Sequence, residues 1–122
     1  MTTEELTACL VRTLDKRLAT DVRVLEVGAL TSIADRFVIA SGNSTTQVKA
    51  LADYAEEALR EQGVVPLREE GYSSAQWVLL DYGYVVLHLF QQNTRQFYDL
   101  EHLWADATDL PIAPYLNSEE SE

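Results

Sequence analysis

The chain has 122 residues, 47% of them hydrophobic, which suits one domain with a hydrophobic core and is short for two domains. Its net charge of −11, from 20 acidic and 9 basic residues, disfavours direct nucleic-acid binding, which needs clustered Lys and Arg; the simplest role of this acidity is solubility. The single cysteine excludes an internal disulfide and a cysteine-based metal cluster, and no apolar run approaches the roughly 20 residues that span a bilayer.

The N-terminal segment predicts an amphipathic helix over residues 3–18. Leucines recur every four residues along it, and Thr2 with Glu5 fits a capping box. The same segment lacks the basic-then-apolar order of a secretion signal and the Arg-rich character of a transit peptide. We therefore expect a cytoplasmic protein, most simply a bacterial one.

Two strands and a long helix are expected next. The segment "VRVLEV" (22–27) alternates with period two, as a half-buried strand does, and "RFVIAS" (36–41) is an apolar run suited to the interior of a sheet. Residues 45–62 give the strongest helical pattern, and Gly63 provides its stop. The apolar stripe of this helix comprises Val48, Leu51, Ala52, Ala55, Ala58 and Leu59.

The second half of the chain predicts three strands and a last helix. Residues 64–70 form a weaker strand, which Pro66 places at an edge. Residues 75–82 and 84–91 are two strong strands, and the short "DYG" between them indicates a hairpin.

The last helix is expected to run from an Asn93 cap through Trp104, with Phe97 and Leu100 on the same face as Trp104. Residues 108–122 contain two prolines and an acidic end, so we expect a flexible acidic tail behind a domain of residues 1–107. The element order predicts an α/β (α+β) fold with a single mixed sheet of about five strands flanked by helices.

A small-residue turn after the second strand raises the question of phosphate binding. Ser41 and Gly42 end an apolar strand just before a helix, which is a common phosphate-binding arrangement. However, Ser44 to Gln47 reads "STTQ", a capping box that satisfies the first backbone donors without a ligand, and neither a Walker motif nor a dinucleotide fingerprint is present. The structural role is favoured over a phosphate site.

The predicted hairpin is apolar on both faces. Trp77, Leu79 and Asp81 alternate with Val78, Leu80 and Tyr82, so the two sets point to opposite sides of the sheet. A carboxylate is unfavourable to bury unpaired, which suggests that the Trp77 row reaches solvent and serves as an interface. The alternative, Trp77 packed under a helix of its own domain, is about equally favoured by these arguments.

Other polar residues give no convincing catalytic arrangement. His88 lies in an apolar strand, where a hydrogen-bonded core role is commoner than metal ligation, and His102 lies on a different element. Ser, His and Asp residues occur without a nucleophile-elbow motif. The acidic residues Asp99, Glu101 and Asp106 are expected on the solvated face of the last helix.

Three segments together resemble the ribosome silencing factor family, also called the Iojap or RsfS family. They are "SIADRFVIASGNSTTQVKALAD", "REEGYSSAQWVLLDYGYVVLHLF" and "RQFYDLEHLWADA", which occur in the order that the family has them. The resemblance covers roughly residues 4 to 107. It implies a fold similar to nucleotidyltransferases without their activity, and no catalytic residue, cofactor or metal.

The resemblance also implies a partner and a role. Family members bind large-subunit ribosomal protein fourteen on the face that meets the small subunit, block subunit association, and repress translation when nutrients are scarce. They are often homodimers when free, and neither a membrane nor sequence-specific nucleic-acid binding is expected. The implied partner-binding residues are Trp77, Leu79 and Asp81 in the strand motif, and Tyr98, Asp99 and Glu101 in "FYDLE".

One position departs from the family pattern. Family members usually read Asp-x-Gly-Asp where this chain reads Asp81-Tyr82-Gly83-Tyr84, so Tyr84 replaces a second carboxylate. Because a nucleotidyltransferase needs paired carboxylates for its metal, this weakens the enzyme alternative. That alternative is a divergent nucleotidyltransferase or phosphate-binding enzyme built on residues 41–44 and Asp81. A homodimeric adaptor that uses the Trp77 face is a third possibility.

Overall fold

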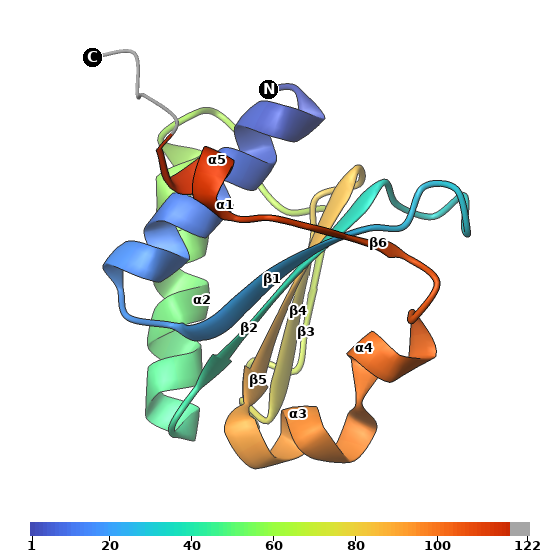
Figure 1. Ribbon diagram of the computed structural model, residues 1–122. Coiled ribbons are helices and arrows are strands. Elements are labelled where there is room, and N and C mark those ends of the chain that lie inside the picture. The colour runs from blue at the N-terminus through green and yellow to red at the C-terminus, as the bar shows by residue number, and fades with distance from the viewer. Residues whose placement is uncertain (118–122) are drawn as a thin grey trace.

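The computed structural model describes residues 1–117, which form one mixed sheet of six strands with helices on both faces (Figure 1). The strand order is β3-β4-β5-β2-β1-β6, and only the β2–β5 pair is parallel. The elements are α1 (Thr3–Lys16), β1 (Thr20–Glu26), β2 (Arg36–Gly42), α2 (Thr45–Arg60), β3 (Arg68–Glu70), β4 (Trp77–Asp81), β5 (Val85–Gln91), α3 (Gln92–Tyr98), α4 (Leu100–Leu103), β6 (Thr108–Leu110) and α5 (Ala113–Leu116). The predicted mixed α/β class with a single sheet is confirmed.

Helices α1 and α2 cover one face of the sheet over β1, β2, β4 and β5. Their apolar stripes pack on side chains from β1, β2, β4 and β5, and this larger core contains most of the fully buried residues. Both helices begin as their sequences predict: the Thr2 hydroxyl accepts from the Glu5 N–H, and the Ser44 hydroxyl accepts from the Gln47 N–H at 3.1 Å. The Gln47 side chain accepts from the Asn43 N–H at 2.6 Å instead of from Ser44, so the second capping box is shifted by one residue.

Substitution of Ser44 with alanine is expected to lower the free energy of unfolding by about 1 kcal/mol, because it removes the N-cap acceptor of α2. Urea denaturation of the variant measures this. Ser73→Ala, at an exposed turn position, is the control and should change stability by less than about 0.5 kcal/mol. An unchanged Ser44→Ala midpoint would mean that the cap contributes nothing.

The other face of the sheet is covered less completely. Its smaller core contains Phe37, Ile39, Val86 and Phe90, with Leu100 from the α4 segment above them. In Figure 1, α3 and α4 lie near one end of the sheet, on the side away from α1 and α2, which run along the other face. Trp77 and Leu79 are therefore only partly buried.

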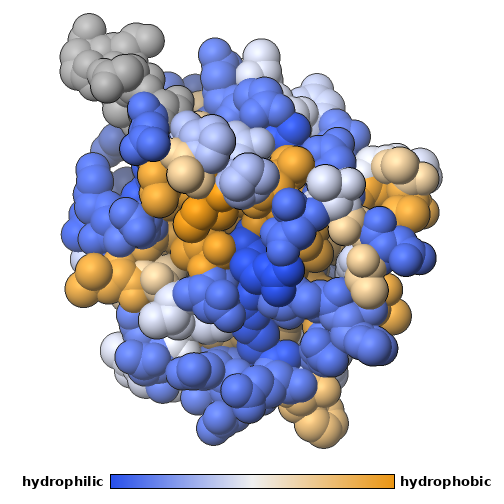
Figure 2. Space-filling model, viewed as in Figure 1, coloured by the Kyte–Doolittle hydropathy of each residue, from blue (hydrophilic) through white to orange (hydrophobic). Residues whose placement is uncertain are grey.

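Residues 108–117 differ from the flexible tail expected at 108–122. Thr108–Leu110 forms β6, which pairs antiparallel with β1 and adds the sixth strand. Leu110, Ile112 and Tyr115 then pack against the larger core, and the Tyr115 hydroxyl accepts from Arg36 at 2.9 Å. Figure 2 shows apolar atoms gathered over α1 and α5 among mostly hydrophilic surroundings. Residues 118–122 of the expected tail lie outside the described residues.

The prediction of a single helix from Asn93 to Trp104 is wrong. This segment forms two short helices, α3 and α4, which are separated at Asp99, a residue with left-handed backbone angles (φ 51°, ψ 55°). The cap of α3 is Gln91, whose side chain accepts from the Asn93 N–H at 3.0 Å. The break turns Phe97 away from Leu100, so Phe97 is 81% exposed while Leu100 is buried. Asp tolerates this conformation better than most residues.

Within the described residues, none of the helices combines the length and hydrophobicity that crossing a membrane requires.

Candidate functional site

The row of Trp77, Leu79 and Asp81 lies on the less covered face of β4. All three side chains are partly buried, whereas Val78 and Leu80 on the opposite face are fully buried. The alternation confirms the assignment of the two faces from sequence. The row also faces solvent in part because α3 and α4 do not extend over all of β4.

Trp77 is held by its neighbours as well as being partly exposed. Its ring stacks on Phe90, directly opposite on β5, with centroids 4.9 Å apart, and lies 5.1 Å from the Tyr98 ring on α3. Its indole N–H donates to Nδ1 of His88 at 3.1 Å. Trp77 therefore packs in the smaller core and is also partly exposed to solvent. The sequence had left open whether Trp77 reaches solvent or packs under a helix of its own domain, and the structure shows some of each.

His88 is a hydrogen-bonded core residue, as predicted. It is only 4% exposed, and its ring meets Phe37 edge-on at 4.7 Å. Because Nδ1 accepts from Trp77, the ring proton of the neutral imidazole must lie on Nε2. Burial lowers the pKa of His88 from 6.5 to about 4, and the nearby carboxylate of Asp81 opposes this only in part.

Acidification is expected to weaken the fold through His88. The unfolded chain binds the His88 proton near pH 6.5 and the folded chain only near pH 4, so this contribution is complete above about pH 6.5 and is lost as the pH falls toward 4. The loss approaches about 3 kcal/mol. Urea denaturation at about pH 6.5 and about pH 4 measures this loss of stability. His88→Asn should remove this pH dependence, whereas His102→Asn, at an exposed position, should retain it. Equal pH dependence in the parent and His88→Asn would contradict the assignment.

Asp81 closes the hairpin between β4 and β5. One carboxylate oxygen accepts from the Gly83 N–H at 2.8 Å, and the other lies 3.5 Å from Nη2 of Arg68 on β3. Gly83 itself has φ of 90°, which favours glycine at this turn. Asp81 therefore has a structural role in the turn in addition to placing negative charge at the end of the Trp77 row.

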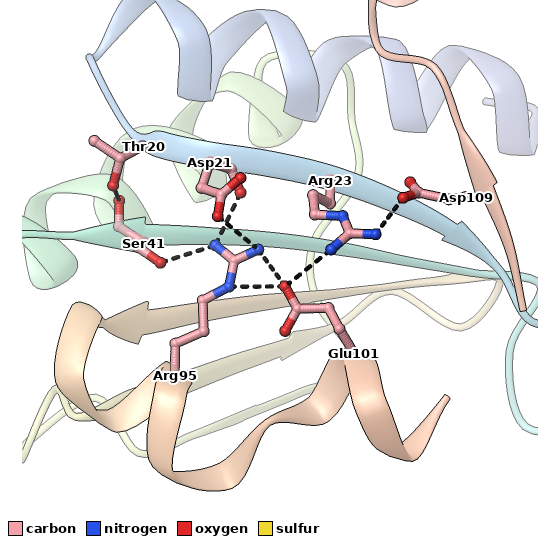
Figure 3. A network of polar contacts seen from close by, with 7 residues as sticks. All are labelled: Thr20, Asp21, Arg23, Ser41, Arg95, Glu101 and Asp109. Atoms are coloured by element: carbon pink, nitrogen blue, oxygen red, sulfur yellow. Dashed lines mark hydrogen bonds and ion pairs between the residues drawn. The ribbon is translucent and has the colours of Figure 1, made fainter. Parts of the chain in front are cut away.

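The "FYDLE" residues fall into two groups. Tyr98 is 54% exposed and contacts Trp77, and Asp99 is exposed at the break between α3 and α4. The structure thus brings Tyr98 and Trp77 together from distant parts of the chain. Glu101 instead turns toward the sheet and is engaged by two arginines (Figure 3).

Arg95 is the centre of the polar network in Figure 3 and was not singled out from sequence. It is 6% exposed. Its Nε donates to Glu101 at 2.9 Å, and its Nη1 donates to the Ser41 hydroxyl and to the Asp21 carbonyl, both at 2.8 Å. Glu101 also lies 3.8 Å from Nη1 of Arg23, which pairs with Asp109 on β6.

This network joins α3 and α4 to β1, β2 and β6. An ion pair shielded from water is strongly held only when both charges have good partners, and here each guanidinium nitrogen of Arg95 has one. The sequence offered a weak signal at most, since an arginine in "NTRQFY" is indistinguishable from one on a solvated helix face. The network fixes the corner at Asp99 and so fixes where Tyr98 meets Trp77.

Comparison with known proteins decides the family. The family model described as "Ribosomal silencing factor during starvation" matches residues 1–122. The chain belongs to this family. The resemblance noted in the sequence is therefore confirmed, and the match includes residues 108–117, which form β6 and α5.

Two bacterial relatives are similar over most of their length, and a mouse relative is similar over less than half of its length. The protein named ribosomal silencing factor RsfS from Halalkalibacterium halodurans is 42% identical over 112 residues, which are 92% of this chain and 96% of that protein. A crystal structure of a Chromobacterium violaceum protein has a TM-score of 0.83 at 37% identity, covering 86% of this chain and 88% of that chain. The mouse protein named mitochondrial assembly of ribosomal large subunit protein 1 is 34% identical over 98 residues, and the match spans 43% of its length.

The geometry argues against the enzyme alternative, in agreement with a family of regulatory proteins. Asp81 pairs across β5 with Val86, whereas Ser41 pairs with Phe90 from the other side, so the two lie about 13 Å apart along the strands. Ser41 is also already occupied by Arg95. One reacting group cannot contact both residues.

Tyr84 occupies the position where the family pattern has a second carboxylate. Tyr84 is 58% exposed beside the hairpin turn, so this end of β4 has the carboxylate of Asp81 without the second one that the family pattern led us to expect. Among residues 1–117 there is no group of three or more His, Cys, Asp or Glu side chains that is placed to hold a metal ion.

Proposed function

We propose that this protein binds the large ribosomal subunit through ribosomal protein fourteen on its intersubunit face, blocks association with the small subunit, and so represses translation when nutrients are limiting. The observation that carries the proposal is the partly open sheet face on which Trp77, Leu79 and Tyr98 form an apolar centre. Family membership supports the ribosome as the target, and the name of the mouse relative supports the large subunit.

The surroundings of this centre favour a basic protein partner. Asp99 lies beside Tyr98 along the chain, Asp81 ends the row, and Glu70 lies directly opposite Leu79 on β3. Arg68, paired with Glu70 and near Asp81, offsets part of this charge. An apolar centre with a charged rim is the usual anatomy of a protein interface, and the acidic rim selects for positive potential across it.

The roles of the six implied contact residues differ in this proposal. Trp77, Leu79 and Tyr98 supply apolar contact, while Asp81 and Asp99 supply negative charge at the edge. Glu101 acts indirectly, because its carboxylate is engaged by Arg95 and holds the corner that carries Tyr98. The mechanism is steric: occupying the intersubunit face excludes the small subunit, and no bond is made or broken.

Co-sedimentation with purified subunits tests the proposal. The protein is expected to sediment with large subunits and not with small ones, and binding should weaken as ionic strength rises, because salt screens an acidic rim facing a basic protein. Adding it before mixing should also reduce the formation of joined ribosomes in sucrose gradients. The control is naked ribosomal RNA, which should not be bound. Equal binding to that RNA, or to small subunits, would contradict the proposal.

A further inference from the structure

The indole N–H of Trp77 is fully used inside the protein. It donates to Nδ1 of His88 at 3.1 Å, and an indole has one donor and no acceptor. Although Trp77 lies at the surface, it has no hydrogen-bonding capacity left for another molecule while this bond is intact.

His88 occupies a place where an apolar residue is expected. It is surrounded by Phe37, Phe90 and Trp77, and within the described part of the chain its Nε2 has no hydrogen-bond partner. An unpaired buried N–H is destabilising, so a leucine here would be a more favourable choice for stability alone. Among residues 1–117, the bond to Trp77 is the one hydrogen bond that the His88 side chain makes.

The Trp77 ring is also held in place by other aromatic rings. It stacks on Phe90 at an interplanar angle of 27°, and Tyr98 lies against it from α3. With its N–H bonded and its ring in contact on these sides, the side chain has little freedom to lose when a partner binds. Losing less conformational entropy on association increases affinity.

We propose that His88 is a positioning residue for the docking surface, which is the apolar centre of Trp77, Leu79 and Tyr98 with its acidic rim. His88 accepts the hydrogen bond of the Trp77 indole N–H, and this bond holds the indole ring in one orientation as an apolar contact surface. The inference rests on the proposed ribosomal function. It also specifies the partner chemistry, namely an apolar side chain packed on the indole with basic residues around it to meet Asp81 and Asp99. A hydrogen-bond acceptor aimed at the indole N–H would not fit.

A set of three variants tests this role. His88→Leu removes the acceptor, His88→Asn places an amide oxygen near the position of Nδ1, and Trp77→Phe removes the donor. His88→Leu is expected to weaken co-sedimentation with large subunits about fivefold, and His88→Asn less than about twofold. In the Trp77→Phe background, His88→Leu should have no further effect, because the bond is already absent.

Measurements on the free protein accompany the binding data. The parent should show the Nε2–H tautomer of His88 by nitrogen NMR, and slow solvent exchange of the Trp77 indole proton that becomes fast in His88→Leu. Urea denaturation should show His88→Leu to be at least as stable as the parent at neutral pH, so that its weaker binding is not due to unfolding.

Binding by the parent protein tests the proposed function, and the difference between the parent and His88→Leu tests the positioning role of His88. If the parent binds large subunits and His88→Leu binds as well, or if His88→Leu weakens binding equally in the Trp77→Phe background, the positioning role is wrong and the proposed function stands. An Nδ1–H tautomer in the parent would also overturn it. If the parent does not bind large subunits, the proposed function fails and the inference fails with it.

Discussion

Replacing Arg95 with methionine is expected to lower the free energy of unfolding by about 3–5 kcal/mol, the usual effect of removing one partner from a buried ion pair. Methionine replaces the apolar stem of the side chain but ends near the position of Nε, so the loss reports the charge, its hydrogen bonds and the space that the guanidinium filled. Among residues 1–117, Arg23, 3.8 Å away, would be the remaining ion-pair partner of Glu101, and the Asp21 carbonyl and Ser41 hydroxyl would lose a donor.

Urea denaturation measures this effect, and a surface arginine provides the matched control. Arg68 forms an ion pair with Glu70 at 2.7 Å with both side chains more than half exposed, so Arg68→Met should lower stability by at most about 1 kcal/mol. Arg95→Lys should fall between the parent and Arg95→Met, since an ammonium group cannot reproduce the forked contacts of a guanidinium. Similar losses for Arg95→Met and Arg68→Met would show that the network is no stronger than a surface pair.

Elements with a strong local signal could be predicted from the sequence. The stripe and Ser44 cap of α2, and the apolar run of β5, depend on residues near each other in the chain, and both elements are present with ends shifted by at most two residues. Strand β6 has no such signal, because it contains three residues and is followed by Pro111. It exists because β1 offers it a partner, and this pairing depends on contacts that are distant in sequence.

The candidate site was predictable in the same uneven way. Alternation along β4 correctly separates Trp77 from Val78, since the period of a strand is two. The inward turn of Glu101 follows the left-handed backbone at Asp99, whereas Tyr98 ends α3 before that break and meets Trp77 through a contact that is distant in sequence. The helical pattern continues from 93 to 104 without a signal for that break, so the sequence predicts Glu101 on the solvated face of the helix. In the structure Glu101 accepts a hydrogen bond from Arg95.

Replacement of Trp77 with alanine is expected to affect binding and folding together. Loss of an aromatic anchor at the centre of an interface should weaken binding to large subunits by on the order of 2 kcal/mol or more, which is about 30-fold. The variant should also lose stability, because the ring stacks on Phe90 and Tyr98 and bonds to His88. This loss should be below the roughly 3–5 kcal/mol of a fully buried tryptophan, since Trp77 is partly exposed.

Trp104 provides a control of the same residue type. It is also partly buried in the smaller core and meets Phe37 edge-on at 5.2 Å, but it belongs to the segment after α4 and not to the β4 row. Trp104→Ala should therefore lower stability to a similar extent and leave subunit binding nearly unchanged. Denaturation and co-sedimentation on both variants separate the two effects, because a general loosening of this core would weaken binding in both. If Trp77→Ala remains folded and sediments fully with large subunits, or if Trp104→Ala loses as much affinity, the β4 row is not the centre of the docking surface.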